Sequence, residues 1–594
     1  MSFSTALRLE DVDDYITPAQ TCIKPVKIDT QRGQTKSIRI EQDGSYTAVT
    51  ENGEKYTLKK AAISLNDCLA CSGCITTAES VLVSQHSSNV LLEFLGRNRE
   101  AQPNERRILV LSISPQSVAS LAAELLESSV SKIARCFREW KASSLKGFAW
   151  SDIEFVHHFL IYYLYSIGAH AVLDTTWARD LALEESGNEF VSRFAASDDA
   201  SHNIPQKLPV FCGICPGWVC YAEKTYDAAN DGESVSRNSD CPSFSIVPHL
   251  STVKSPQQIL GRLLKRCHAE SIYHVTVMPC FDRKLEASRE EFSQPADSSS
   301  DHSRTPDVDL VLATTELVDI LNETCWDSRR SQVFLSKDEL ATFWGGPPRL
   351  TPENQERLES IIQSFGGFLP DPYGLTTSAK PLSGELNMYR HQGSGSGGYA
   401  FSVFCFAASR LFGIQISDPL NDVHVLVRQL HNRDMQEMLL FSSAADRDVA
   451  QVAVSSLPNT RAPYRQSKSR VQPLLAFAVA NGFRNIQSIV RPLRLLYRAK
   501  QNKTTGRSVN YPFDYVEVMA CPAGCLNGGG QLKEDLEKVH EFYMNLPVNP
   551  LRLNAVSQAL YLTVDNSDGE HKSLRTTYRQ VPKIEIVNPS ALHW

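Results

Sequence analysis

The cysteines of this chain include one compact run with the spacing of a metal site. In NDCLACSGC, two residues separate Cys68 from Cys71 and Cys71 from Cys74. Thiolates at this spacing can face one iron-sulfur cluster, but the fourth Cys that continues the run in bacterial ferredoxins is missing. Cys22 is the only other cysteine before Cys136, so we expect it to be the fourth ligand. A zinc ion, or simple packing, is the alternative.

A second group of cysteines is dispersed along the chain. Cys521 and Cys525 lie four residues apart in VMACPAGCLNGGG, while Cys215 lies in FCGICPGW and Cys280 in MPCFDRKLE. Four residues make about one helical turn, so the pair can direct both thiolates at one cluster. The glycines that follow permit close approach of the backbone. Each fragment alone is weak, because a buried cysteine usually packs as a small apolar side chain.

Strands and helices must bring these dispersed cysteines together. Apolar runs predict buried strands at residues 107–113, 208–214, 273–280, 308–314, 423–430 and 515–521. Helical patterns lie between them, for example at 115–140 and 256–270. This alternation predicts an α/β fold with mainly parallel sheets, in which sites form at the carboxyl ends of strands. Cys215, Cys280 and Cys521 lie at or next to such ends, so they can meet in space.

Composition and charge set the broad class of the protein. Of the 594 residues, 42% are hydrophobic and 21% charged, and the net charge of −7 gives no basic footprint for nucleic acid. No apolar run is long enough to span a bilayer, and the N-terminal residues lack a secretory pattern. We expect a cytoplasmic location, with the nucleus as a second one, and neither membrane nor nucleic-acid binding. Fifteen cysteines in a reducing compartment favour metal binding over disulfides.

The dispersed fragments together resemble the active-site motifs of the iron-only hydrogenases. The motif E-x-M-x-C-x-x-G-C-x-x-G-G-G is matched in full by Glu517, Met519, Cys521, Gly524, Cys525 and Gly528 to Gly530. T-S-C-C-P-x-W is matched at Cys215, Pro216 and Trp218, and M-P-C-x-x-K-x-x-E at Met278, Pro279, Cys280 and Glu286. LSTVKSPQQ (250–258) and GSGSGGYAFSVF (393–404) are also similar to segments of that family. The resemblance implies that Cys215, Cys280, Cys521 and Cys525 hold a cluster between two lobes.

Two departures from the hydrogenase motifs bear on activity. In active hydrogenases, a free thiol that carries protons precedes the cluster-ligating Cys of the first motif. Ile214 stands at that position here, and it cannot ionise. The Lys of the second motif is Arg283, with Lys284 one residue later, and Arg differs from Lys in size and geometry. The resemblance therefore implies a hydrogenase-like protein without catalytic residues.

This pattern is similar to that of the nuclear prelamin A recognition factor-like branch, whose members act in cytosolic iron-sulfur protein assembly. In that branch an early Cys and a C-x2-C-x2-C run hold a further cluster, as Cys22, Cys68, Cys71 and Cys74 would here. The resemblance implies two [4Fe-4S] clusters and a role linking the early scaffold complex to the late targeting complex that inserts clusters into apoproteins. The alternatives are an active hydrogenase or other redox enzyme, and an interaction protein without clusters.

Three regions are expected. Residues 1–105 form an N-terminal iron-sulfur module, 106–530 a two-lobed hydrogenase-like α/β domain, and 531–594 a C-terminal region. Stretches near 228–243, 287–307 and 454–470 are rich in Ser, Pro, Asn and charge, so we expect surface insertions there. The chain ends in Leu592, His593 and Trp594, and a terminal Trp can fill an apolar pocket of a targeting-complex partner. An incidental frayed tail is the alternative.

Overall fold

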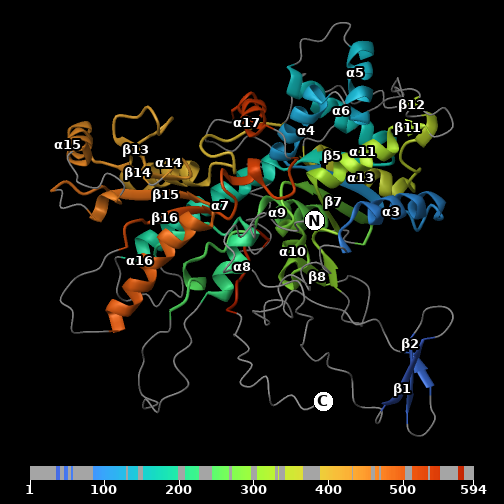
Figure 1. Ribbon diagram of the computed structural model, residues 1–594, viewed down its shortest axis with the longest axis horizontal. Coiled ribbons are helices and arrows are strands. Elements are labelled where there is room, and N and C mark those ends of the chain that lie inside the picture. Colours follow the sequence, from blue (N-terminus) through green and yellow to red (C-terminus); the bar gives the residue numbers. More distant parts are fainter. Residues whose placement is uncertain are drawn as a thin grey trace. The chain divides into compact units, whose positions relative to one another are not determined.

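The structure is a computed structural model of the chain (Figure 1). It describes residues 35–40, 46–50, 55–57, 85–128, 131–144, 151–197, 208–225, 244–266, 270–295, 304–327, 332–333, 342–365, 388–430, 432–455, 462–466, 470–501, 511–532, 535–548 and 573–580. The chain divides into two units, of which the larger extends over residues 85–580. In the smaller unit, β1 (Thr35–Ile40), β2 (Tyr46–Thr50) and β3 (Lys55–Thr57) form an antiparallel sheet.

The first sheet of the larger unit is wholly parallel. Its order is β10 (Leu310–Ala313), β7 (Ile272–Met278), β4 (Ile108–Ile113) and β5 (Ala171–Asp174). Every residue of β4 is buried, because helices cover both faces of the sheet. Ile108 and Val110 face one apolar cluster, and Leu109 and Leu111 face the other, which is the alternation of a strand. The parallel strands predicted from the apolar runs are therefore confirmed in this sheet.

Helices of the first lobe cover the outer face of this sheet. They are α3 (Ser88–Glu100), α4 (Pro115–Glu127), α5 (Lys132–Ser144), α6 (Asp152–Ser166), α11 (Thr314–Thr324) and α17 (Leu536–Met544). The continuous helical pattern expected at 115–140 is wrong, because the backbone of Ser128 is extended and ends α4. At the start of α4, Ser114 accepts a hydrogen bond from the Ser117 N–H and Pro115 occupies the first turn. Helices α3 and α17 share the apolar cluster on this face of the sheet, and the three regions expected from the sequence stay a prediction.

The second sheet is mixed. Its order is β13 (Val425–Gln429), β14 (Met435–Leu440), β15 (Leu475–Asn481), β16 (Tyr515–Met519) and β6 (Val210–Phe211). The pairs β15–β16 and β16–β6 are parallel, but β13–β14 and β14–β15 are antiparallel. A short connection joins β13 to β14, which only an antiparallel pair allows. The expectation of mainly parallel strands thus holds for half of the pairs in this sheet.

Helices α7 (Thr176–Ser197), α9 (Pro256–Leu264) and α14 (Tyr399–Phe412) lie between the two sheets in one shared apolar cluster (Figure 1). Helices α8 (Pro216–Lys224) and α16 (Phe483–Gln501) cover the opposite face of the second sheet. The remaining elements of three or more residues are α10 (Asp282–Ala287), α13 (Pro352–Phe365), α15 (Ala444–Ser455), β8 (Ser293–Pro295) and β9 (Arg304–Pro306), with 3-10 turns at Val247–His249, Glu290–Phe292, Tyr464–Gln466 and Gly524–Asn527.

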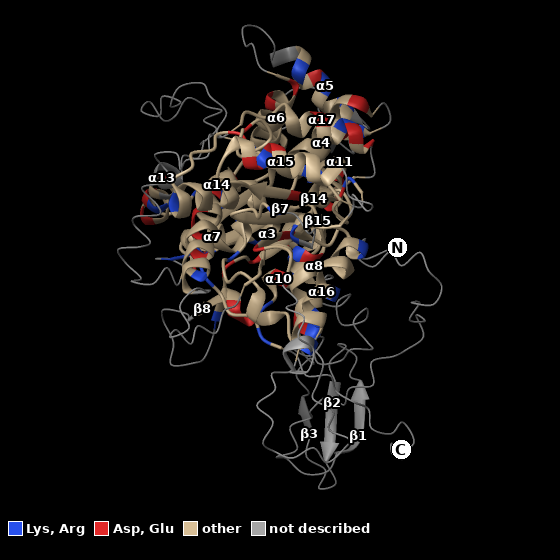
Figure 2. Ribbon diagram, turned by 90° about the vertical axis from the view of Figure 1, so that its left-hand side faces the viewer, with Lys and Arg blue, Asp and Glu red and all other residues tan. Residues whose placement is uncertain are grey.

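Acidic and basic residues are interspersed along the helices (Figure 2). None of the described helices is long and apolar enough to cross a membrane.

Two of the three expected insertions are packed in part. In the stretch 287–307, β8 and β9 form a hairpin, Phe292 is buried and Asp307 is fully buried. In the stretch 454–470, Tyr464 is fully buried and its N–H donates to Glu437 at 3.0 Å. These anchoring contacts belong to the described parts of the two stretches, and the expected insertions stay a prediction. Residues 228–243 lie outside the described part of the chain.

Candidate metal centre

Three of the four dispersed cysteines follow the carboxyl ends of parallel strands directly or after a short turn. Cys215 follows β6 and begins α8, Cys280 joins β7 to α10, and Cys521 follows β16. Cys525 lies one turn later, in the 3-10 turn Gly524–Asn527. Strand β6 comes from a distant part of the chain, yet it pairs in parallel with β16. The carboxyl ends of the two strands therefore lie side by side, and Cys215 and Cys521 follow those ends. The predicted placement at strand ends is what brings these loops together.

Backbone contacts hold the cysteine loops against each other. The Ala520 N–H donates to the Cys215 sulfur, with 3.4 Å between nitrogen and sulfur. The Gly530 N–H donates to the Pro279 carbonyl at 2.9 Å, which ties the glycine run to the loop of Cys280. Segments more than 200 residues apart in the sequence therefore form one neighbourhood.

The pKa shifts couple Cys215 with Cys525, and Cys280 with both Cys521 and Cys215. The pKa of Cys215 is raised to about 11, mainly by burial and next by the nearby Cys525. Burial also raises the pKa of Cys280 well above its ordinary value, with smaller contributions from Asp282, Cys521 and Cys215. Buried thiolates that lie close together repel one another unless cations compensate their charge. The arrangement thus suits thiolates whose protons are replaced by metal.

The donor set fits an iron-sulfur cluster. Cys215 and Cys521 are buried, and Cys280 and Cys525 are half-buried, so a group held by all four would be largely shielded from water. Within the described ranges, no three Cys, His, Asp or Glu side chains are arranged to share a single metal ion. Four Cys thiolates are the usual ligand set of a [4Fe-4S] cluster, and these loops supply that number. An N–H donor to a sulfur, as Ala520 provides to Cys215, is a common support for such clusters.

One of two adjacent basic residues faces the thiols. Arg283 is buried and donates to Glu286 at 2.7 Å. Burial opposes its charge, but Glu286 and the thiols of Cys280 and Cys525 raise the pKa of Arg283 above its ordinary value. Lys284 instead donates to Glu316 at 2.6 Å, away from these thiols. The cation beside the cysteines is therefore a guanidinium.

Ile214 packs in the apolar cluster between the two sheets and is 4% exposed. The nearest preceding thiol, Cys212, is buried in the same cluster. Burial, followed by the nearby Glu517, raises the pKa of Cys212 well above its ordinary value. The position that carries protons in the hydrogenase motif therefore holds an aliphatic side chain in a dry environment.

A glycine-serine loop supports Cys525, and sequence reasoning assigned it no ligand role. The Cys525 N–H donates to the Ser396 hydroxyl at 3.0 Å. Gln116 of α4 donates to the Gly395 carbonyl at 2.9 Å and accepts from Arg179 of α7 at 3.1 Å. Arg179 is buried, and its charge lowers the pKa of Cys525, which burial otherwise raises. The resemblance included the GSGSGG segment that contains Ser396 but gave this serine no role, and no local pattern signalled Arg179 or Gln116.

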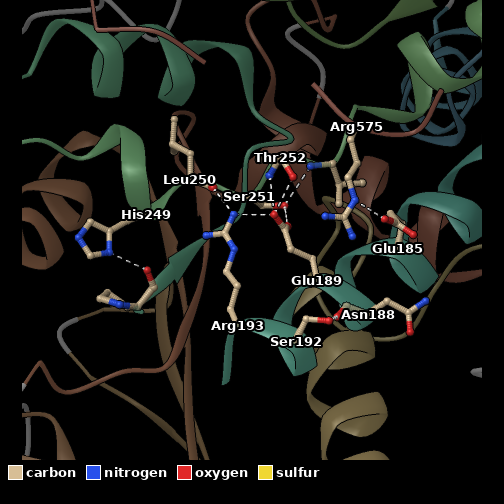
Figure 3. A network of polar contacts seen from close by, with 12 residues as sticks. Glu185, Asn188, Glu189, Ser192, Arg193, His249, Leu250, Ser251, Thr252 and Arg575 are labelled. Carbon is tan, nitrogen blue, oxygen red and sulfur yellow. Dashed lines mark hydrogen bonds and ion pairs between the residues drawn. The ribbon is translucent and has the colours of Figure 1, made fainter. Parts of the chain in front are cut away.

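A buried polar network around Glu189 holds residues 250–252 (Figure 3). The Glu189 carboxylate accepts from the Ser251 hydroxyl at 2.5 Å and from the Thr252 N–H at 2.9 Å, and pairs with Arg193 at 2.5 Å. Burial alone would raise the pKa of Glu189, but Arg193 and these donors lower it, so the carboxylate is ionised. A Cβ at Gly213 would lie 2.6 Å from the Ser251 carbonyl, so only glycine fits this approach.

The C-terminal residues 573–580 form a strap over the same segment. The Thr576 N–H donates to the Thr252 carbonyl at 2.7 Å, and the Lys254 N–H donates to the Leu574 carbonyl at 2.8 Å. Leu574 is fully buried. The Tyr578 hydroxyl donates to the Gly213 carbonyl at 3.3 Å. The strap therefore reaches the residues that precede Cys215, a connection that no sequence pattern indicated.

Two truncations should separate this strap from the residues beyond it. Removal of 573–594 is expected to lower the free energy of unfolding by about 3–5 kcal/mol, because a buried Leu is lost and Glu185 loses its ion pair with Arg575. Removal of 581–594 alone deletes none of these contacts and should leave it unchanged. Denaturant unfolding of both proteins measures the difference. Equal stability of the two truncated proteins would contradict the role of the strap.

The other predicted site residues lie outside the described residues. Cys22, Cys68, Cys71 and Cys74 belong to the N-terminal part in which only strands β1 to β3 are described. Trp594 lies beyond the last described residue. The N-terminal cluster and the role of the tail therefore stay predictions.

Comparison with known proteins identifies relatives over the whole chain. A family model described as iron only hydrogenase large subunit, C-terminal domain, matches residues 133–339 and 427–529. Cytosolic iron-sulfur assembly component 3 of Bos taurus is 36% identical over 602 residues, covering 98% of this chain and 97% of the relative. The Mus musculus protein of the same name is 37% identical over 599 residues, with the same coverage. The cytosolic Fe-S cluster assembly factor narfl of Xenopus tropicalis is 34% identical over 604 residues, covering 98% of each chain.

Solved hydrogenase structures are also similar. A variant of apo [FeFe]-hydrogenase HydA1 from Chlamydomonas reinhardtii matches with a TM-score of 0.46 and 20% identity, over 83% of this chain and 99% of that chain. The full-length relatives and the family model confirm the resemblance inferred from the motifs. The chain carries the C-terminal domain typical of iron-only hydrogenases and belongs to the cytosolic iron-sulfur assembly component 3 family.

Proposed function

We propose that this protein is a component of the cytosolic iron-sulfur protein assembly machinery, carries two [4Fe-4S] clusters and lacks hydrogenase activity. The observation that supports the proposal is that backbone contacts hold the four cysteine loops against each other, while a buried Ile214 precedes Cys215. Cys215, Cys280, Cys521 and Cys525 would hold the buried cluster. When bound, such a cluster supplies a redox-active iron group bridged by sulfide.

The residues of this chain would hold and shield that group. Arg283 places a positive charge beside two of the thiols, which favours their ionised form. The Ala520 N–H and the loop of Ser396 support Cys215 and Cys525 from opposite segments. Ile214 occupies the position that carries protons in hydrogenases, and its side chain cannot ionise. This supports a non-enzymatic role.

The second cluster and the partners rest on the sequence. The spacing of Cys22, Cys68, Cys71 and Cys74, together with relatives that match 98% of the chain, supports a second four-thiolate site. The names of those relatives support a cytosolic place of action among other assembly proteins. The chain would link the scaffold and targeting complexes, with Trp594 as one contact and the nucleus as a second location.

The proposal predicts selective loss of cytosolic iron-sulfur enzymes. Cells depleted of their own assembly component would receive the wild type, Cys525→Ala or the control Cys220→Ala, whose thiol is half-buried on α8. Radioactive iron incorporation into one cytosolic and one mitochondrial iron-sulfur enzyme would be measured. The wild type and Cys220→Ala should restore the cytosolic enzyme, Cys525→Ala should not, and the mitochondrial enzyme should not change.

Two outcomes would replace this proposal by its alternatives. Full rescue by Cys525→Ala would favour an interaction protein that needs no buried cluster. Hydrogen evolution from reduced methyl viologen by the purified, iron-loaded wild type would favour an active redox enzyme.

A further inference from the structure

Helix α7 places a guanidinium in the interior of the larger unit, against the glycine-serine loop that supports Cys525. Arg179 lies near the start of this helix and is 5% exposed. Its Nη2 atom donates to the Gln116 Oε1 atom at 3.1 Å, and Gln116 donates to the Gly395 carbonyl at 2.9 Å. These two hydrogen bonds fix the guanidinium relative to the 393–398 loop.

The same loop contacts Arg179 and Cys525 at neighbouring residues. A Cβ built at Gly397 would lie 3.0 Å from both Cδ and Nε of Arg179, so the loop and this side chain are closely packed. At the preceding residue, the Ser396 hydroxyl accepts the Cys525 N–H at 3.0 Å. Burial raises the pKa of Cys525, and the charges of Arg283 and Arg179 are among the effects that lower it. Arg179 is therefore within electrostatic reach of a proposed cluster ligand.

This guanidinium has no carboxylate of its own. Among the described residues Arg179 forms no ion pair, and its buried Nη1 atom has no hydrogen-bond partner. Nearby carboxylates are bound to other groups. Asp174 and Glu517 each accept a backbone N–H at 2.7 Å, and Asp180 pairs with His391 at 2.6 Å.

Other buried guanidinium groups of the larger unit do have a carboxylate partner. Arg283, the second guanidinium near the thiols, pairs with Glu286 at 2.7 Å. Arg193, farther along α7, pairs with Glu189 at 2.5 Å. A buried charge without a partner strongly destabilises a fold. Arg179 therefore calls for an anionic group that the described side chains do not supply.

An iron-sulfur cluster is such an anionic group. A four-iron cluster with four thiolate ligands carries net negative charge, and reduction by one electron makes that charge more negative. The net charge around a cluster is one of the factors that set its reduction potential. A buried cation stabilises the reduced form more than the oxidised form, and salt screens a buried charge only weakly.

We propose that Arg179 is the internal counter-charge of the buried cluster and raises its reduction potential. The inference rests on the proposed function, because it needs the cluster that the four thiols would hold. Arg179 is a positioning residue and not a ligand, since it acts through the 393–398 loop and through its charge. Glu286 partly neutralises Arg283, so Arg179 supplies the positive charge that no carboxylate offsets.

A redox titration followed by electron paramagnetic resonance tests this role. The full-length protein would be purified anaerobically and poised at the potential at which half of the buried cluster of the wild type is reduced. The signal of that cluster is the one that Cys525→Ala lacks. Arg179→Met removes the charge but keeps a long, unbranched side chain. Its ratio of reduced to oxidised cluster should fall about tenfold, which equals about 59 mV for a one-electron couple.

Two control variants separate charge from packing. Arg179→Lys keeps a positive charge on a flexible stem, so its ratio should stay within about threefold of the wild type. Arg410→Gln removes a guanidinium from an exposed position on α14, where solvent and salt screen its charge. This variant should have the ratio of the wild type. Iron analysis and circular dichroism of each variant would show whether the cluster and the fold are retained.

The wild type separates failure of this inference from failure of the proposed function. A wild type without any four-iron signal would overturn the proposed function. A wild type with the signal, together with an unchanged ratio in Arg179→Met, would overturn the role of Arg179 alone.

Iron retention decides the matter if Arg179→Met does not hold the cluster. Loss of the buried cluster from Arg179→Met but not from Arg179→Lys would support the counter-charge, because only the charged side chain then suffices. Loss from both variants, or equal ratios in both, would show that Arg179 acts through packing, and would overturn the proposal.

Discussion

Replacing Cys525 with alanine is expected to remove about half of the iron and acid-labile sulfide, from about eight of each per chain to about four, as for loss of one of two four-iron clusters. Cys525 lies near Cys215 and Arg283, so its loss leaves three thiol ligands for the cluster. Iron and sulfide would be measured on anaerobically purified protein, together with circular dichroism to show that the fold is retained.

Cys220→Ala is the control for this measurement. Cys220 lies on α8, one turn beyond Cys215, and has similar burial to Cys525, but it is not one of the four converging thiols. Its replacement should leave about eight irons per chain. Unchanged iron in Cys525→Ala would remove Cys525 from the ligand set. Iron near zero in the wild type, or zinc in its place, would contradict the cluster proposal altogether.

Gly528→Ala is expected to abolish the buried cluster although it removes no thiol. A Cβ at Gly528 would lie 2.2 Å from the Pro279 carbonyl oxygen and 3.2 Å from that of Cys525. The Pro279 carbonyl is fixed by the Gly530 N–H, so the strain can be relieved only by separating the loops of Cys280 and Cys525. We expect the same loss of iron as in Cys525→Ala, and destabilisation of about 2–4 kcal/mol, as for overpacking of a closed site.

Gly96→Ala is the matched substitution without a clash. No atom lies within 4 Å of a Cβ at Gly96, which is in α3. Alanine there should leave the iron content unchanged and stabilise the helix by about 0.5–1 kcal/mol. Denaturant unfolding and iron analysis of the two variants would be compared. Full iron content in Gly528→Ala would show that the two loops do not need this close approach.

Local sequence patterns predicted much of the larger unit. The runs at 107–113, 273–280 and 515–521 became strands β4, β7 and β16, because continuous β-branched and aliphatic residues suit strands buried on both faces. The helical pattern at 256–270 became α9 with an earlier end. The motif letters also named the four dispersed thiols, and their sharing of one cluster stays a prediction.

Other features depended on contacts that no local pattern contains. The antiparallel half of the second sheet arises from the β13–β14 hairpin, and its parallel edge is completed by β6, a strand supplied by a distant part of the chain. In the polar stretch 287–307, the described residues 287–295 and 304–307 include the buried Phe292 and Asp307, which composition does not reveal. The strap at 573–580 packs beside Gly213 through contacts formed across more than 300 residues.

The sequence by itself determined the chemistry available to this protein. Residue type and spacing set the two groups of thiols, the loss of a titratable side chain at Ile214, and a basic pair at Arg283 and Lys284. Only the tertiary structure decided that Arg283 faces the thiols while Lys284 turns to Glu316. It also decided that β13 ends the second sheet, with β14 as its one partner strand among the described residues. Spacing along the chain constrains only near neighbours, whereas the direction of a side chain and the closure of an edge depend on which distant segments pack against them.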